Sequence, residues 1–78
     1  MAVLPTARDH GVADADMFHA VMLAIAVFDQ DDGMVMYIGP ARSGALLEVG
    51  TCERDDVTIV PHAMPARGKY LDRLRKPR

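Results

Sequence analysis

Residues 34–62 read MVMYIGPARSGALLEVGTCERDDVTIVPH, and this stretch decides the fold. Apolar side chains alternate between two faces in three segments, which we expect to be strands: 34–38, 45–52 and 57–62. The polar segments between them contain the turn-forming residues Gly, Pro, Asp and Ser. Strands joined by such short turns are antiparallel neighbours. Pro61 has no backbone N–H, so the last strand should end, bulge or lie at a sheet edge there.

The flanking segments are predicted to be helical. Apolar residues recur at helical spacing after Asp14 and Asp16, and indicate a helix at about 13–24: Phe18, Val21, Met22 and Ile25. We also expect a helical turn over 5–10, and a hairpin at 29–33, where an Asp-Gly pair precedes the first strand. Pro65 can open a final helix, which Pro77 ends.

These elements predict a single α+β domain over residues 1–78. An N-terminal helix packs on a small antiparallel sheet of three to four strands, and a short C-terminal basic helix follows. The chain has 50% hydrophobic residues but only two Phe, two Tyr and no Trp, so six Met must help to fill the core. Because Met packs adaptably but specifies shape poorly, a partner protein could cover part of the surface.

The expected location is the cytoplasm. Cys52 is the only cysteine, which excludes an internal disulfide and suits a reducing compartment. The N-terminus lacks the basic flank and apolar run of a signal peptide. The most apolar stretch, 17–28, is shorter than the roughly 20 residues of a membrane span, so we expect a soluble protein with no membrane partner.

Charge divides the chain into two parts. Residues 1–60 have a net charge of −7, and residues 61–78 have a net charge of +5. A basic segment of this kind can meet phosphate or an acidic partner. Alternatively, it is a solvated helix end and tail, whose charge suits the helix dipole.

The basic segment contains the candidate catalytic residues His62, Arg67 and Tyr70. Metal-independent RNA cleavage needs a base, an acid and a cation for the phosphate, and His and Arg supply these groups. Further cations could bind RNA: Lys69, Arg73 and Arg75. The structural alternative is that Tyr70 anchors the helix to the core, His62 caps a strand and Arg67 is solvated.

No metal site or cofactor is predicted. The acidic turn at 29–32 lacks the downstream acidic ligand of a calcium loop, so a solvated turn is the better interpretation. His10 and His19 have no third ligand at metal spacing, and their roles stay open. Cys52 lies in a predicted strand, as a small buried hydrophobe would.

Several short motifs follow one another in a familiar order: His10-Gly11-Val12, Val27-Phe28-Asp29, Tyr37-Ile38-Gly39, the segment 44–49, Ile59-Val60 and Arg67-Gly68-Lys69-Tyr70. In this order and spacing, residues 8–73 resemble the BrnT-type toxins of type II toxin–antitoxin systems, particularly their short actinobacterial relatives. The N-terminal Trp-Asp strand of that family is not expected here, and the family's Ile-Ile-Ser-Ala-Arg is replaced by Ile59-Val60-Pro61-His62-Ala63.

The resemblance implies a RelE-like ribonuclease fold, RNA cleavage that halts translation, and a cognate antitoxin with a ribbon-helix-helix region. Arg67 and Tyr70 match the family's Arg-x-x-Tyr, and Lys69 would help to hold phosphate. The leading hypothesis is therefore a ribonuclease toxin that an antitoxin neutralises. The toxin could form a homodimer or a hetero-oligomer with that antitoxin. The alternative is a non-catalytic subunit that only binds a partner. A transcriptional regulator is disfavoured because no helix-turn-helix pair is predicted.

Overall fold

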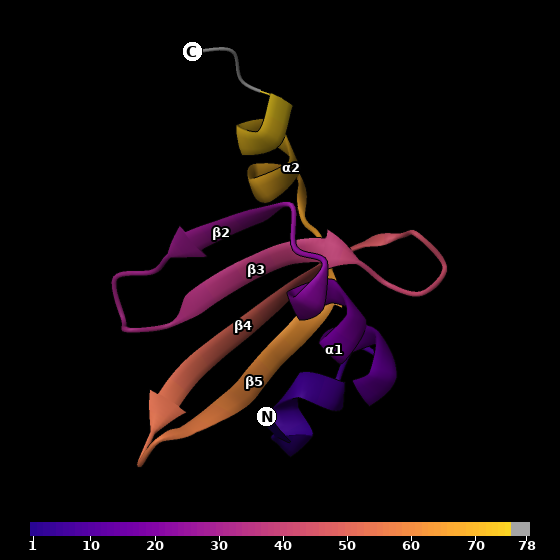
Figure 1. Ribbon diagram of the computed structural model, residues 1–78. Helices are drawn as coiled ribbons and strands as arrows, with labels where there is room; N and C mark the ends of the chain where they lie inside the picture. The colour runs from indigo at the N-terminus through magenta and orange to yellow at the C-terminus, as the bar shows by residue number, and fades with distance from the viewer. Residues whose placement is uncertain (76–78) are drawn as a thin grey trace.

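The strands of this protein form one five-stranded mixed sheet (Figure 1). The computed structural model describes residues 1–75. Its strands are β1 (Ala2–Val3), β2 (Ala26–Asp29), β3 (Val35–Pro40), β4 (Leu46–Arg54) and β5 (Val57–Pro65). Their order across the sheet is β1-β5-β4-β3-β2, with β1 parallel to β5 and the other pairs antiparallel. The helical segments are η1 (Pro5–Arg8), α1 (Asp14–Met22) and α2 (Gly68–Arg75).

The predicted layout of an N-terminal helix on a three- to four-stranded antiparallel sheet, which we associated with a RelE-like fold, is wrong. The sheet begins before the helix, because Ala2 and Val3 pair in parallel with Ile59 and Val60. The predicted order of elements lacked this first strand, and α1 lies between the first and second strands. Two residues are too few to show an alternating pattern, so this strand depends on a partner at the other end of the chain.

The three central strands form close to where alternation predicts them: β3 and β4 begin one residue later, and all three strands end two or three residues later. β5 continues through Pro61, where Val60 and Pro61 together lie opposite one residue of β4: Gly50 pairs with His62, and Cys52 with Ile59. This β-bulge is one of the three outcomes expected at a proline that cannot donate to the ladder. Pro65 belongs to β5 instead of opening the helix, and α2 begins only at Gly68.

The two faces of the sheet carry different cores. On one face, α1 and η1 cover Leu47, Val49 and Ala63 through side chains that include Met17 and Ala7. On the other face, Tyr70 of α2 packs with side chains of β2 and β3: Phe28, Met36 and Ile38. Ile38, Glu48 and Met64 lie opposite one another on three adjacent strands, and His62 lies two residues before Met64. Glu48 and His62 therefore share the face that α2 covers.

Both α-helices are short. α1 has nine residues, with Asp14 and Asp16 in its first turn, where carboxylates favour the helix dipole. α2 has eight residues and bears Arg73 and Arg75 in its last turn. Among residues 1–75, no helix combines the length and the apolar character needed to cross a membrane. The cytoplasmic location stays a prediction.

Candidate functional site

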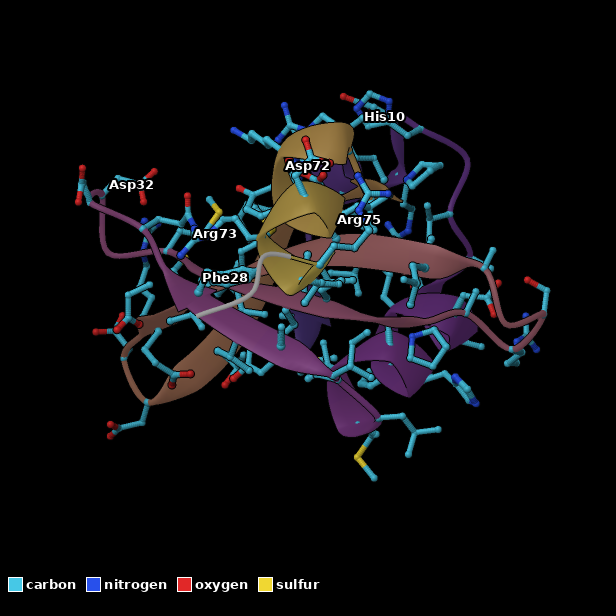
Figure 2. The ribbon with its side chains drawn as sticks, turned by 90° about the horizontal axis from the view of Figure 1, so that it is seen from above. His10, Phe28, Asp32, Asp72, Arg73 and Arg75 are labelled. Carbon is cyan, nitrogen blue, oxygen red and sulfur yellow. The ribbon has the colours of Figure 1, made fainter. Side chains whose placement is uncertain are left out.

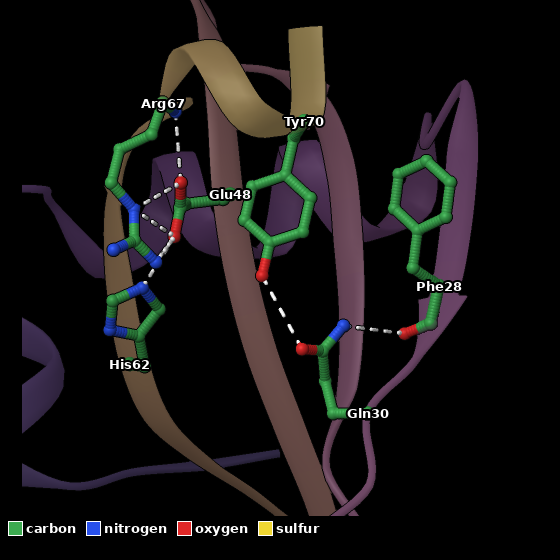
Figure 3. Close-up of polar contacts among 6 residues, drawn as sticks. All are labelled: Phe28, Gln30, Glu48, His62, Arg67 and Tyr70. Atoms are coloured by element: carbon green, nitrogen blue, oxygen red, sulfur yellow. Dashed lines mark hydrogen bonds and ion pairs between the residues drawn. The ribbon is translucent and has the colours of Figure 1, made fainter. Parts of the chain in front are cut away.

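A fully buried carboxylate, Glu48 of β4, holds together two of the predicted site residues (Figure 3). His62 Nε2 lies 2.8 Å from Glu48 Oε2. Arg67 Nη2 donates to the same oxygen over 2.7 Å, while the Arg67 backbone N–H donates to Oε1 over 2.9 Å. Because an ionised carboxylate only accepts hydrogen bonds, the Nε2 atom of His62 carries the proton in this contact. We call these three residues the Glu48 cluster.

Strand register and chain direction build the cluster. Glu48 pairs with Met64 on β5, so His62, which lies two residues before Met64, points from the same face of the sheet. Beyond β5, Ala66 still donates its N–H to the Leu46 carbonyl over 3.0 Å, which keeps the chain beside β4. Arg67 follows directly, and its backbone N–H faces the Glu48 carboxylate just before α2 begins. A negative charge at this position is favourable for a helix N-terminus.

Electrostatics keep Glu48 ionised. Burial alone would raise the pKa of Glu48, but the hydrogen bonds from the Arg67 side chain, the Arg67 backbone and His62 outweigh burial and lower this pKa below its ordinary value. In return, the hydrogen bond from Glu48 raises the pKa of the Arg67 guanidinium. The buried charge is thus fully compensated, which is the condition under which a buried carboxylate is tolerated.

The lowered pKa of Glu48 predicts a loss of stability in acid. A carboxylate whose pKa is lower in the folded state stabilises the fold above its ordinary pKa, and this contribution disappears as pH falls through the folded-state value. We therefore expect Glu48→Gln to flatten the decrease in the free energy of unfolding between about pH 5 and pH 3. Urea denaturation at several pH values measures this slope. Glu53→Gln, an exposed carboxylate on the same strand, is the matched control, and parallel curves for wild type and Glu48→Gln would contradict the prediction.

Two cluster side chains keep atoms that Glu48 does not use. The side chain of His62 is 26% exposed and that of Arg67 is 45% exposed. Within residues 1–75, neither His62 Nδ1 nor Arg67 Nη1 makes a hydrogen bond. Figure 3 shows both atoms on the side of the cluster away from Tyr70. The arrangement can present a proton acceptor and a guanidinium N–H to one ligand.

Tyr70 lies in the core beside the cluster. It is 3% exposed, its ring stacks on Phe28 with 5.8 Å between centroids, and its hydroxyl lies 3.5 Å from Gln30 Oε1 (Figure 3). The Arg67 guanidinium lies 5.9 Å from the ring centroid. This placement favours the alternative in which Tyr70 anchors α2 to the sheet.

The predicted RNA-binding cations lie along α2. Lys69 Nζ is 5.1 Å from the Tyr70 ring, and the Arg73 guanidinium is 3.9 Å from the Phe28 ring, towards β2 (Figure 2). Arg75 pairs with Asp72 on the same helix. The remaining basic residues of this segment, Lys76 and Arg78, lie outside the described residues.

Other candidates have local structural contacts. Asp32 accepts a hydrogen bond from the Met34 N–H over 3.0 Å, as in a hairpin turn. His19 Nδ1 lies 2.7 Å from the Pro40 carbonyl oxygen, and Cys52 is half-buried on β4. Within residues 1–75, no group of three or more His, Cys, Asp or Glu side chains could hold a metal ion.

Sequence reasoning did not identify Glu48 as a site residue. The available signal was the carboxylate of Glu48 within the apolar stretch 45–50, where a buried charge needs partners. Comparisons of the chain with protein-family models, with curated proteins and with solved structures find no match. The case for a function therefore depends on the Glu48 cluster and on the short sequence motifs around it.

Proposed function

We propose that this protein is a metal-independent endoribonuclease and acts as the toxin of a type II toxin–antitoxin pair. The observation that supports this proposal is the Glu48 cluster, in which a buried carboxylate orients one imidazole and one guanidinium. A carboxylate that fixes the tautomer of a histidine leaves the other ring nitrogen available as a base. The sequence motifs that resemble BrnT toxins give the toxin context.

In the proposed reaction, His62 Nδ1 accepts the proton of an RNA 2′-hydroxyl. The 2′-oxygen then attacks the adjacent phosphorus, the bond from phosphorus to the 5′-oxygen breaks, and a 2′,3′-cyclic phosphate and a 5′-hydroxyl form. Arg67 Nη1 donates to the phosphate as its negative charge increases. Glu48 is a positioning residue, because within residues 1–75 its carboxylate hydrogen-bonds to His62 and Arg67, and it stabilises the imidazolium that forms.

The cations of α2 extend the proposed contact with RNA. Lys69 and Arg73 are exposed on α2, and each lies over an aromatic ring. Phosphate contacts from such side chains give affinity without sequence selection and weaken as salt increases. Tyr70 supports these contacts indirectly by holding α2 on the sheet.

The proposed partner is a cognate antitoxin, with a ribbon-helix-helix region as the resemblance implies, and the proposed location is the cytoplasm. Large apolar side chains of α1, of the segment that follows it and of β2 are exposed and offer a surface for it: Phe18, Met22, Leu23, Ile25 and Val27. The exposed fraction of Met22 reaches 81%. Covering such a patch with a protein partner is favourable.

Expression of the chain alone tests the toxin proposal. We expect induction in bacteria to stop growth and to degrade bulk RNA, and Arg67→Ala to restore growth because the phosphate loses its guanidinium. Arg54→Ala, an exposed arginine at the far end of β4, is the matched control and should remain toxic. Normal growth and intact RNA with accumulated wild-type protein would reject the proposal.

The alternative is a non-catalytic subunit that only binds a partner. The exposed apolar side chains of α1 and β2 favour it, and so does the bracing of α2 to the sheet by Glu48 and Arg67. Protein that binds a partner or RNA but never cuts RNA, in either purified or cellular assays, would identify this function.

A further inference from the structure

A second imidazole, that of His10, lies against His62 although the two residues are far apart in the sequence. Their ring centroids are 6.3 Å apart, and the ring planes meet at 72°. His10 is exposed, and Figure 2 shows it at the outer edge of the molecule. The predicted catalytic residues did not include His10, because no local pattern connects it with β5.

The segment before His10 is fastened to the bulge of β5. Thr6 Oγ1 donates to the Pro61 carbonyl oxygen over 2.7 Å, and the Leu4 N–H donates to the Val60 carbonyl oxygen over 2.9 Å. Ala7, a residue of η1, is fully buried in the core. These contacts fix η1 beside the residue that precedes His62.

The segment after His10 is also fixed. Arg8 donates to both carboxylate oxygens of Asp14, with Nε and Nη2 at 3.0 Å and 2.7 Å. Gly11 adopts a φ of +75°, a conformation that side chains with a Cβ disfavour, and so turns the chain from η1 towards α1. His10 thus lies in a short turn that is anchored on both sides, beside His62.

We propose that His10 is the general acid of the ribonuclease reaction, paired with His62 as the general base; this inference depends on the proposed function. The leaving 5′-oxygen needs a proton when its bond to phosphorus breaks, and the Glu48 cluster supplies none because His62 is receiving one. His10 as imidazolium gives its proton to this oxygen and becomes neutral. His62 becomes imidazolium beside Glu48. His62 then releases a proton to water and His10 takes one up from water, which restores both groups.

The pair has the properties that acid–base catalysis requires. An imidazole accepts a proton when it is neutral and donates one when it is charged, so two neighbouring rings can supply a base and an acid. One ring is oriented by a buried carboxylate, and the other is exposed to solvent, where it can regain a proton. Arg67 and His62 share one oxygen of Glu48, and the His62 ring in turn contacts His10, so a phosphate bound between Arg67 and His62 would lie near the His10 ring.

His10→Ala tests the inference with purified full-length protein and total bacterial RNA as the probe. We expect the cleavage rate to fall roughly 100-fold, because general acid catalysis typically contributes 10²–10⁴-fold. Binding to a 2′-O-methyl oligoribonucleotide, which cannot be cut by this reaction, should change less than about twofold. Free imidazole added to the buffer should restore part of the rate of His10→Ala, since the missing side chain leaves an open, exposed position.

The controls separate the inference from the proposed function. His19→Asn removes an imidazole from α1, on the other sheet face, and keeps a donor for the Pro40 carbonyl, so its cleavage rate should equal that of wild type. Wild-type protein that does not cut RNA rejects the proposed function, and the inference with it. Active wild type with an equally active His10→Ala overturns the inference alone. A loss that follows weaker binding or that imidazole does not restore also overturns it, because His10 would then be structural.

Discussion

Replacement of His62 by Gln should lower the rate of the proposed RNA cleavage about 1000-fold, because it removes the proposed base for the 2′-hydroxyl proton. Gln places an amide nitrogen near the position of Nε2, so it can still donate to Glu48 and hold the cluster together. It has no titratable atom in place of Nδ1. Single-turnover cleavage with saturating protein measures the chemical step directly, and the RNA dissociation constant should change little.

Arg67→Lys tests the second residue that Glu48 binds. Lysine keeps a positive charge beside Glu48 but loses the planar fork that binds this carboxylate and that could bind a phosphate at the same time. We expect weaker RNA binding as well as slower cleavage, in contrast to His62→Gln. If His62→Gln cleaves at the wild-type rate, His62 is not the base, and the Glu48 cluster only braces α2.

The central strands could be predicted because their signals are local. Residues 34–62 contain both the alternation and the turns that set register, and no distant segment changes that pattern. β1 could not be predicted, since a strand of two residues exists only through its pairing with Ile59 and Val60. The start of α2 was placed too early because Pro65, although suited to a helix start, continues the ladder opposite Leu47.

The same distinction between local and distant signals applies to the residues of the candidate site. His62 and Arg67 were found because they are close in the sequence within a basic segment. Glu48 and His10 reach them only through strand register and through the hydrogen bond from Thr6 to Pro61, which no sequence spacing encodes. Tyr70 was selected for its spacing from Arg67, but helical spacing alone does not distinguish a ligand contact from a core anchor.

Gly39→Ala should lower the free energy of unfolding by about 3 kcal/mol, in the upper range for overpacking a core. Gly39 lies on β3 beneath α1, and a Cβ at this position would be 2.0 Å from the Ala20 carbonyl oxygen. That atom belongs to the helix backbone and cannot rotate away as a side chain would, so α1 must move off the sheet. A chain of this length has a free energy of unfolding of roughly 4–12 kcal/mol, so this substitution would remove a large fraction of the total stability.

Gly68→Ala is the matched control, because a Cβ there meets nothing within 4 Å and the residue begins α2. Ala is favoured over Gly within helices by up to about 1 kcal/mol, so this variant should be as stable as wild type or slightly more stable. Urea denaturation of both variants measures the difference.

Displacement of α1 would also move Asp14, which binds Arg8 and so holds the turn that contains His10. Gly39→Ala should therefore lose the proposed cleavage activity at urea concentrations where wild type is still folded. Equal midpoints for the two glycine variants would show that α1 does not approach β3 this closely.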